Sequence, residues 1–388
     1  MENYPTQSKG QYLHGPQKLF LETRMLPILA SDEVRIQIRS TTLCGSDVHY
    51  FKYGQNGSIK IKEPLCGGHE AAGVIVAVGQ AVSDGGDLKV GDKVAIESGV
   101  PCGGCQKCRE GHYNVCPELR FRSSGASFPH FQGTLQEFID HPARWCHKSS
   151  RLPDILSCDD GALLEPLSVS IHAIRKANIK PGATCLVFGA GAVGLLCAAV
   201  AKVEHQCPVV IADIDPGRVQ FALDERFADI GFIATPESPS SIEEKLAVAK
   251  KLASDIEKLQ WPGGERVSRP GFVFECTGVE SCVQASICAV DSGGKVVLVG
   301  MGTPIQCWHI AEITGREIDI VSVWRYAHCY PRAIEVMEGV RRHEIGLDLT
   351  KLITHRFSGI ESIPAAYETA SSVRDETSNL IIKAVVNF

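Results

Sequence analysis

The stretch TCLVFGAGAVGLLCAAVAKV, which runs from Thr184 to Val203, decides how this chain folds. Its opening, TCLVF, is a short apolar run that predicts a buried parallel strand, and its closing segment, LLCAAVAKV, predicts an apolar helix. Between them stands GAGAVG, a GxGxxG pattern. That pattern recurs by chance when it stands alone, but here it has the strand before it and the helix after it that a dinucleotide site requires. The stretch therefore predicts the first strand and helix of a nucleotide-binding α/β sheet.

The glycines of this motif have separate physical roles. Gly189 permits the tight turn, Gly191 lets the backbone approach a pyrophosphate, and Gly194 lets the helix pack closely on the strand. Val193 lies in the same turn, so we expect it to contact the cofactor. The start of the helix then offers free N–H groups and a positive dipole end to the phosphates.

The carboxylate of Asp213 predicts which nicotinamide cofactor binds. Asp213 ends the next predicted strand, VVIAD, where a carboxylate accepts hydrogen bonds from the adenosine ribose and repels a 2′-phosphate. This predicts NAD rather than NADP. The alternative is that Asp213 only caps the turn before Pro216. Arg218 lies close by and is also expected at the cofactor, although an arginine there can instead receive a 2′-phosphate.

Apolar strands and helical segments alternate through the middle of the chain. The runs Val209–Ala212, Phe272–Glu275 and Lys295–Val299 read as further buried parallel strands. Ser240–Leu259 is charged and amphipathic, as in a surface helix, and Pro262–Pro270 reads as a loop. This alternation predicts a doubly wound Rossmann sheet over residues 168–323.

The beginning of the chain has a different pattern, with short β-type runs and turn pairs. Examples are Glu33–Arg39, Gly73–Val78 and Lys93–Ile96, with a Gly91-Asp92 turn between such runs. The chain ends in an alternating strand, Leu380–Val386, which predicts a return to the first domain. We therefore expect residues 1–167 and 324–388 to form one mostly antiparallel, barrel-like β domain.

Composition limits the possible partners and compartments. The chain has 388 residues, 44% of them hydrophobic, and a net charge of −6, which gives no reason to expect nucleic acid as a partner. No apolar run approaches the roughly 18 residues of a membrane span. The first residues are polar and lack the apolar core of a signal peptide, so the expectation is a cytoplasmic protein without a membrane partner. Clustered cysteines in such a chain indicate metal or redox chemistry.

Four cysteines predict a structural metal site: Cys102, Cys105, Cys108 and Cys116. Their close spacing lets four thiolates converge on a tetrahedral zinc ion at roughly 2.3 Å. A closed set of four thiolates leaves no open position, so this zinc would be structural. The alternatives are four unrelated reduced cysteines, or a nucleic-acid-binding zinc module, which the acidic chain and the dinucleotide motif disfavour.

A second set of metal-binding side chains is Cys44, His69 and Glu70. Each is unremarkable by itself: a buried cysteine, a histidine in a turn and an adjacent glutamate. Their flanking sequences, CGSDVH and GGHE, bring a soft ligand, an imidazole and several carboxylates together. One Cys, one His and one carboxylate with an open fourth position would make a zinc site that binds an alcohol.

Several blocks occur along the chain in this order: CGSDVH, GGHEAAG, the four-cysteine segment, LLEPLSVS, GAGAVG, ECTGVE and THRF. In this order they resemble the zinc-containing medium-chain dehydrogenase/reductase family, and within it the polyol dehydrogenases for sorbitol, xylitol and L-arabinitol. The resemblance spans nearly the whole chain. It implies a GroES-like catalytic domain with a structural zinc lobe beside the Rossmann domain, an active site between them, NAD, two zinc ions per chain, and a homotetramer.

The resemblance also implies roles for residues of the zinc site. Cys44, His69 and Glu70 match the catalytic zinc ligands, and Asp47 resembles the carboxylate that orients the ligating histidine. Glu165, in LLEPL, matches a carboxylate that ligates the zinc or contacts its bound water. Simple alcohol dehydrogenases have a cysteine in this region, so Glu165 favours a polyol.

Other positions match the proton route and the substrate pocket. Ser46 and His49 resemble the hydroxyl and imidazole near the proton-exit route, and we expect Glu70, Ser46 and His49 to help pass the substrate proton to solvent. The side chains expected to line the substrate pocket are Tyr50, Phe121, Arg325 and Tyr326.

The chain departs from the family pattern in three places. Residues Arg122–Ala126 replace a Thr-Pro-Pro turn, and Ala327–Pro331 replace the commoner Cys-Asn-Thr-Trp-Pro. Both lie near the expected pocket, so they bear on the choice of substrate and not on the chemistry. The helix Ser240–Leu259 and the following loop look longer than in animal sorbitol dehydrogenases.

The expected activity is oxidation of a sugar alcohol, D-sorbitol first and xylitol or L-arabinitol next, to a ketose with hydride transfer to NAD. The nearest alternative is another NAD-linked zinc dehydrogenase, for butanediol, threonine or a simple alcohol. A zinc-free quinone reductase is disfavoured by the presence of Cys44, His69 and Glu70 together. A non-catalytic binding protein with the same fold is disfavoured by the intact ligand and proton-relay residues.

Overall fold

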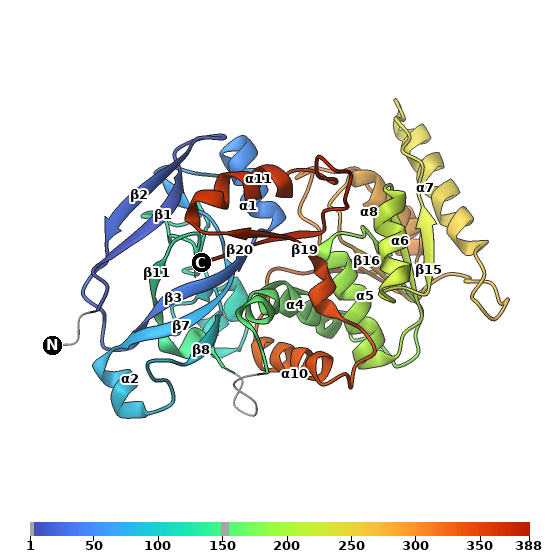
Figure 1. Ribbon diagram of the computed structural model, residues 1–388. Coiled ribbons are helices and arrows are strands. Elements are labelled where there is room, and N and C mark those ends of the chain that lie inside the picture. The colour runs from blue at the N-terminus through green and yellow to red at the C-terminus, as the bar shows by residue number, and fades with distance from the viewer. Residues whose placement is uncertain (1–3, 149–154) are drawn as a thin grey trace. The chain divides into compact units, whose positions relative to one another are not determined.

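The computed structural model describes residues 4–148 and 155–388, which form two compact units (Figure 1). The first unit contains residues 1–165, 327–344 and 349–388, and the second contains residues 166–326 and 345–348. The division falls inside helix α4 (Cys158–Ala177), between Glu165 and Pro166. Among the described residues, no helix is both long enough and apolar enough to cross a membrane.

The second unit is built on a six-stranded parallel sheet with the order β15-β14-β13-β16-β17-β18. This is the strand order of a doubly wound dinucleotide-binding fold, in which the chain reverses direction at the first strand. Short apolar runs form it because parallel strands are covered on both faces. Its strands are β13 (Cys185–Phe188), β14 (Val209–Asp213), β15 (Ile230–Ile233), β16 (Phe272–Glu275), β17 (Lys295–Leu298) and β18 (Asp319–Ser322).

Helices cover the sheet and bury its apolar side chains. Besides the C-terminal half of α4, they are α5 (Ala192–His205), α6 (Pro216–Asp224), α7 (Ile242–Glu257), α8 (Glu280–Ala289) and α9 (Ile310–Gly315). The expected surface helix is α7, which begins with a capping box between Ser241 and Glu244. Its Ala249, Ala253 and Ile256 are buried in one cluster with side chains of the central strands. The doubly wound α/β prediction is confirmed.

The first unit contains a seven-stranded sheet, ordered β12-β8-β7-β3-β20-β19, with β11 also pairing with β3. A three-stranded sheet, β2-β1-β6, stands beside it. Strands of the first unit are β1 (Gln7–Leu13), β2 (Leu19–Met25), β3 (Glu33–Thr42), β4 (Gln55–Asn56), β5 (Ile59–Lys60), β6 (Leu65–Cys66), β7 (Glu70–Val78), β8 (Lys93–Ile96), β9 (Gly99–Val100), β10 (Arg120–Phe121), β11 (Phe138–Pro142), β12 (Cys146–His147), β19 (Ile353–Ser358) and β20 (Lys383–Asn387).

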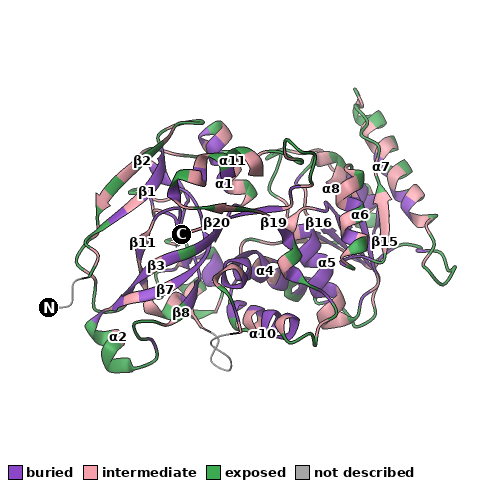
Figure 2. Cartoon of the chain, in the orientation of Figure 1, coloured by how far each residue is buried: buried purple, intermediate pink, exposed green. Residues whose placement is uncertain are grey.

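Short helices connect these strands. They are α1 (Gly45–Tyr53), α2 (Gln80–Gly85), α3 (Gln106–Arg109), α10 (Tyr330–Arg341) and α11 (Ile363–Ala370), with single 3-10 turns at Tyr113–Val115, Ala143–Trp145, Leu349–Leu352 and Ile360–Ser362. The pairings of the large sheet are antiparallel except that of β19 with β20, which is parallel. In Figure 2, β7, β16 and β20 are drawn mostly as buried, so the cores of the two units lie around their sheets.

The last strand returns to the first unit, where β20 lies between β3 and β19. It begins at Lys383, whereas the alternation of the sequence predicts a start at Leu380. The difference arises because Leu380 forms an isolated bridge with Arg374 instead of joining the sheet. The pairing of Val385 with Thr42 brings Lys383 to the end of β3.

Candidate active site

Three metal-binding side chains of the first unit converge at the end of β3. Strand β7 pairs with β3 so that Glu70 lies opposite Thr42, and Cys44 follows two residues later as the N-cap of α1. One donor atom each from Cys44, His69 and Glu70 lies within 4.8 Å of the others. His69 and Glu70 are buried, with exposed fractions of 5% and 1%. A thiolate, an imidazole and a carboxylate at these separations are a donor set that suits zinc.

A buried carboxylate, Asp47, holds the segments that contain these ligands. It accepts hydrogen bonds from the backbone N–H groups of Cys44 (3.1 Å) and Gly68 (2.9 Å), and its Oδ2 lies 3.5 Å from Nδ1 of His69. Burial alone would raise the pKa of Asp47, but His69 and the two N–H donors lower it below its ordinary value. The ionised carboxylate therefore orients the imidazole, as the resemblance implies.

The protonation of His69 depends on its contact with Asp47. Burial favours the neutral imidazole, but the charge of Asp47 and its hydrogen bond raise the pKa of His69 well above the ordinary value. A metal-binding histidine must have one nitrogen free of protons. With Nδ1 facing Asp47, Nε2 is the nitrogen that would bind zinc, and Nδ1 would carry the remaining proton.

Glu70 has two partners that the sequence did not predict. Its Oε2 accepts hydrogen bonds from the hydroxyl of Thr42 and the ammonium group of Lys383. Lys383 is buried and also donates to the carbonyl of Leu43 at 3.2 Å. Burial disfavours a charged lysine, but Glu70 and Cys44 raise the pKa of Lys383 above its usual value. Since both bonds use Oε2, Oε1 is the oxygen that would bind a metal.

Glu165 lies near this cluster but outside its inner group. It is buried near the middle of α4, and its charge acts on Lys383. Its carboxylate is not among the donor atoms that lie within 4.8 Å of one another. The structure therefore places Glu165 beside the group of Cys44, His69 and Glu70 and not within it.

Of four further predicted residues in the first unit, three lie on α1 and Phe121 lies on β10. Ser46 is half-buried and His49 is exposed, with its ring edge-on to Tyr53 at 5.8 Å. The ring of Phe121 lies 5.4 Å from the His69 ring, and Tyr50 is buried. The Tyr50 hydroxyl accepts a hydrogen bond from the Gly125 N–H at 3.1 Å, so the departure segment Arg122–Ala126 contacts a predicted pocket residue.

The other two predicted pocket residues, Arg325 and Tyr326, belong to the second unit. Arg325 has a left-handed backbone (φ 52°), and its guanidinium lies 5.0 Å from the ring centre of Trp324. Tyr326 is buried. These residues follow β18 at the carboxyl edge of the parallel sheet, where doubly wound folds bind ligands.

The four cysteines of the predicted structural lobe are close together. Their Sγ atoms are separated by 3.5 Å (Cys105–Cys108), 3.6 Å (Cys102–Cys116), 3.8 Å (Cys105–Cys116) and 4.0 Å (Cys102–Cys108). Tetrahedral coordination with bonds of about 2.3 Å requires sulfur–sulfur separations of about 3.8 Å. Backbone N–H groups of Gly104 and Cys105 lower the pKa of Cys102 to about 7, which favours its thiolate. The lobe fits a closed structural zinc site.

The GxGxxG turn of the second unit fits a dinucleotide. Gly189 has a left-handed backbone (φ 96°), and a Cβ on Gly194 would lie 1.8 Å from the Gly189 oxygen. A Cβ on Gly191, the N-cap of α5, would meet nothing within 4 Å, so the backbone there is open to a ligand. Val193 follows on the first turn of α5 and is half-buried.

Asp213 has a structural role as well as the predicted cofactor role. Its two oxygens accept hydrogen bonds from the N–H groups of Ala190 (2.7 Å) and Asp215 (2.9 Å). A carboxylate has about four lone-pair positions, so Asp213 can also accept hydrogen bonds from ribose hydroxyls. Capping the turn and binding the cofactor therefore do not exclude each other. Arg218 lies on the first turn of α6, and its buried Nε has no partner among the described residues. Such a donor suits an oxygen of the cofactor.

Residues outside the GxGxxG motif complete this edge of the sheet. The buried carboxylate of Glu275, at the end of β16, accepts hydrogen bonds from the N–H groups of Thr277 (2.8 Å) and Gly278 (2.9 Å). A Cβ on Gly278 or Gly300 would lie within 2.3 Å of the facing backbone. The sequence signal that could have indicated these residues is the ECTG block at Glu275–Gly278, together with Gly300 and Gly302 after the next strand.

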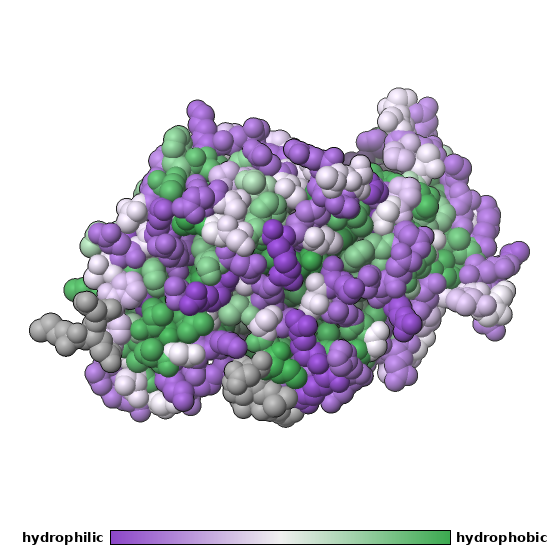
Figure 3. All heavy atoms as spheres, viewed as in Figure 1, coloured by the Kyte–Doolittle hydropathy of each residue, from purple (hydrophilic) through white to green (hydrophobic). Residues whose placement is uncertain are grey.

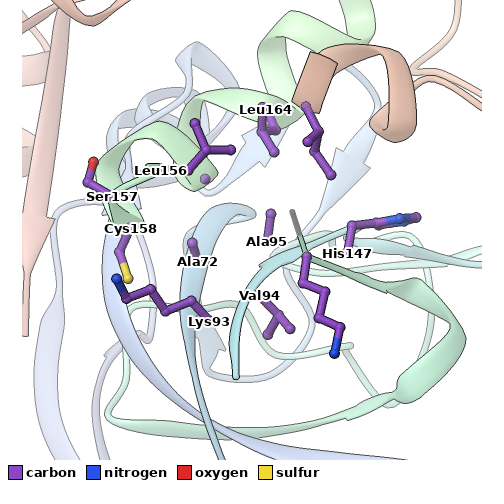
Figure 4. A pocket seen from close by; sticks show the side chains of 12 residues that line it. Ala72, Lys93, Val94, Ala95, His147, Leu156, Ser157, Cys158 and Leu164 are labelled. Carbon is purple, nitrogen blue, oxygen red and sulfur yellow. The ribbon is translucent and has the colours of Figure 1, made fainter. Parts of the chain in front are cut away.

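A separate hollow in the first unit is too small for a sugar alcohol (Figure 4). It is lined by Lys93, His147 and Cys158 among others, and by none of the zinc-site side chains. Its water-accessible volume is about 30 Å³, room for about one or two water molecules.

Comparison with known families agrees with this geometry. The alcohol dehydrogenase GroES-like domain matches residues 30–154, and the zinc-binding dehydrogenase domain matches residues 192–339. This chain belongs to the zinc-binding dehydrogenase family. Membership makes this dehydrogenase an oxidoreductase and implies zinc and a nicotinamide cofactor.

Similar proteins cover nearly all of this dehydrogenase. L-arabinitol 4-dehydrogenase of Penicillium rubens is 38% identical over 348 residues, 89% of this chain and 83% of that protein. Sorbitol dehydrogenase of Mus musculus is 38% identical over 367 residues, 94% of each chain. A similar solved structure is that of ECK1772 from Escherichia coli, an oxidoreductase of unknown specificity, with 29% sequence identity and a TM-score of 0.80. The match covers 98% of this chain and 99% of that chain.

The two metal sites predict different consequences of cysteine replacement. Cys105→Ser should lower the melting temperature, because a closed structural zinc site contributes directly to folding. Cys44→Ser should abolish turnover with a much smaller change in melting temperature. Calorimetry and zinc analysis of both variants test this, and equal thermal losses would contradict the division into structural and catalytic sites.

The glycine turn predicts that two similar replacements act differently. Gly194→Ala should destabilise the protein by about 1–3 kcal/mol or more, because its Cβ meets backbone that cannot move aside. Gly191→Ala should keep the melting temperature and weaken binding of NADH, since the added methyl occupies the open approach to the pyrophosphate. Calorimetry and NADH titration separate the two effects, and unchanged NADH affinity in Gly191→Ala would contradict the assignment.

Proposed function

We propose that this chain is a zinc-dependent, NAD-linked polyol dehydrogenase that oxidises a sugar alcohol to a ketose. The observation that carries the proposal is the convergence of Cys44, His69 and Glu70, three donors that leave a zinc ion one position for a substrate oxygen. We assign a second zinc ion to the four-cysteine lobe. Relatives named sorbitol and L-arabinitol dehydrogenase support the class of substrate.

The chain's own residues would hold the reactants and move one proton. When bound, zinc acts as a Lewis acid on the substrate hydroxyl, and the nicotinamide accepts the hydride. Ser46 would take the hydroxyl proton and pass it to His49, whose exposed ring reaches solvent. Asp47 keeps the His69 ring in place, and Lys383 balances the charge of Glu70. Binding of remote hydroxyls by Tyr50, Arg325 and Tyr326 would orient the reacting carbon.

Our order of substrates is D-sorbitol first, then xylitol and L-arabinitol. Glu165, where simple alcohol dehydrogenases have a cysteine, supports a polyol. The nearest alternative is an NAD-linked zinc dehydrogenase for butanediol, threonine or a secondary alcohol. Measuring NADH formation with sorbitol, xylitol, L-arabinitol, galactitol and ribitol, beside 2,3-butanediol, threonine and 2-propanol, tests the proposal. Turnover confined to the last three substrates would overturn the polyol assignment.

We further propose that the enzyme is a homotetramer of the cytosol. The outer strand β18 has one neighbour in its sheet, and large apolar side chains stay exposed nearby in sequence, among them Met301 (52%), Ile305 (87%) and Ile310 (61%). Such side chains suit contact with a second copy. The face drawn in Figure 3 mixes hydrophilic and hydrophobic residues. Sedimentation velocity tests the assembly, and a monomer at micromolar concentration would exclude it. Cysteines without disulfide partners at both proposed zinc sites fit a reducing compartment.

The carboxylate of Asp213 predicts the cofactor preference. Asp213→Ser should raise kcat/KM with NADP relative to NAD, because the repulsion of the 2′-phosphate is removed. The same change removes the bond to Ala190, so melting temperature is measured alongside. Wild-type protein that uses NADP as well as NAD would contradict this assignment.

Arg325 predicts a difference between polyols and short alcohols. Its planar fork of donors suits several hydroxyl oxygens at once. Arg325→Ala should lower kcat/KM for sorbitol at least tenfold, about 1.4 kcal/mol, and change the value for 2-propanol much less. Equal losses on both substrates would assign Arg325 to the fold or cofactor, and no loss would remove it from the site.

A further inference from the structure

The segment that replaces the expected Thr-Pro-Pro turn contacts the zinc site through Ser123. The Ser123 hydroxyl oxygen lies 2.7 Å from Nδ1 of His69, and Ser123 is buried, with an exposed fraction of 3%. Asp47 Oδ2 lies 3.5 Å from the same nitrogen. The hydroxyl is therefore the nearer hydrogen-bond partner of the imidazole.

The direction of this hydrogen bond follows from the metal site. Two oxygens face Nδ1 of His69, and a nitrogen that carries a proton can donate to them. Nε2 is then the proton-free nitrogen that would bind zinc. Ser123 Oγ therefore accepts the bond, and it does so without adding negative charge beside the ligands.

The backbone of Ser123 is held in an unusual conformation. Its φ of 58° lies in the left-handed region, which is costly for a residue with a Cβ. The Ser123 N–H donates to the carbonyl of Phe131 at 2.9 Å, and the Arg122 N–H donates to the carbonyl of Ser98 at 3.1 Å. The Ser98 hydroxyl in turn donates to the carbonyl of His69. The bond of Arg122 thus links the segment through Ser98 to the same histidine that Ser123 contacts.

A buried cation anchors the same segment. The guanidinium of Arg122 donates to the carbonyl of Gln132 (2.8 Å) and to Nδ1 of His141 (3.1 Å), and it lies 4.2 Å from the centre of the Phe131 ring. Burial lowers the pKa of Arg122 to about 10, so it stays charged at neutral pH. An arginine buried with these partners fixes the neighbouring residue in one place.

We propose that Ser123 is a positioning residue for His69, a second hydrogen-bond acceptor beside Asp47 that orients the imidazole and slows loss of the catalytic zinc. This role rests on the zinc site of the proposed function. Hydrogen bonds to the distal nitrogen of a ligating histidine fix its ring and its tautomer, and removal of such a partner typically weakens metal binding 10–100-fold. Because Asp47 still holds His69 when the Ser123 hydroxyl is removed, we expect zinc binding to weaken by about tenfold.

Two replacements separate the hydroxyl from the strained backbone. Ser123→Ala removes the hydroxyl and keeps a Cβ at positive φ, whereas Ser123→Gly removes the hydroxyl and relieves that strain. Ser127→Ala is the matched control, since Ser127 lies in the same loop and, within the described part of the chain, its hydroxyl bonds only to the nearby carbonyl of Pro129. The measurement is zinc release to a chromogenic chelator under native conditions, with melting temperature alongside.

The two zinc ions provide an internal comparison. The time course of zinc release should have two phases, one for each zinc ion. The phase that Cys44→Ser removes belongs to the catalytic site, and the remaining phase, that of the four-cysteine lobe, serves as the reference. We expect both Ser123 variants to release the catalytic zinc about tenfold faster. The lobe phase should not change, the control should behave as wild type, and Ser123→Gly should keep the wild-type melting temperature.

Other outcomes would overturn the proposal in distinguishable ways. Wild-type release rates in both variants would exclude a role of the hydroxyl, and a fast Ala variant with a normal Gly variant would assign the effect to backbone strain. Wild-type protein with only the zinc of the lobe would overturn the proposed function together with this role.

Discussion

The site depends on one buried carboxylate, that of Asp47. A carboxylate with an exposed fraction of 1% is stable only with partners, and here they are the N–H groups of Cys44 and Gly68 and the imidazole of His69. One donor follows β3 and the other precedes β7. The carboxylate is therefore satisfied only when those two segments have closed on each other, so the contacts that complete the fold also bring the ligands together.

The local features of the sequence predicted most of the fold. The run FVFE became β16 without any shift of its ends, and the glycine motif occupies the predicted turn between β13 and α5. The cysteine lobe was also predictable, because all of its ligands fall within one short segment whose spacing limits their geometry. In each case the information lies within a few residues, where hydrophobic period and turn chemistry determine the structure.

The partners of the zinc ligands were not predictable, because they come from distant segments. Ser123 follows His69 by more than fifty residues, and its role depends on a left-handed backbone that no sequence period encodes. Lys383 was hidden in an alternating strand, where a charged residue among apolar ones reads as solvent-facing. Each of Cys44, His69 and Glu70 has an ordinary structural explanation by itself, and only their flanking sequences and combined donor chemistry, supported by the resemblance, predicted them as ligands.

The ion pair of Lys383 with Glu70 explains why the chain must return to its first unit. Glu70 begins β7 inside the sheet, and a buried carboxylate without a cation would carry a large desolvation cost. The cation comes from β20, the last strand, which pairs with β3 next to the ligands. A zinc ion bound by Glu70 would add positive charge to the same carboxylate, so Lys383 and the metal share one anion. The thiolate of Cys44 and the carboxylates of Asp47 and Glu165 add further negative charge close by, so one ammonium and one divalent cation would together offset a cluster of buried anions that neither could offset alone.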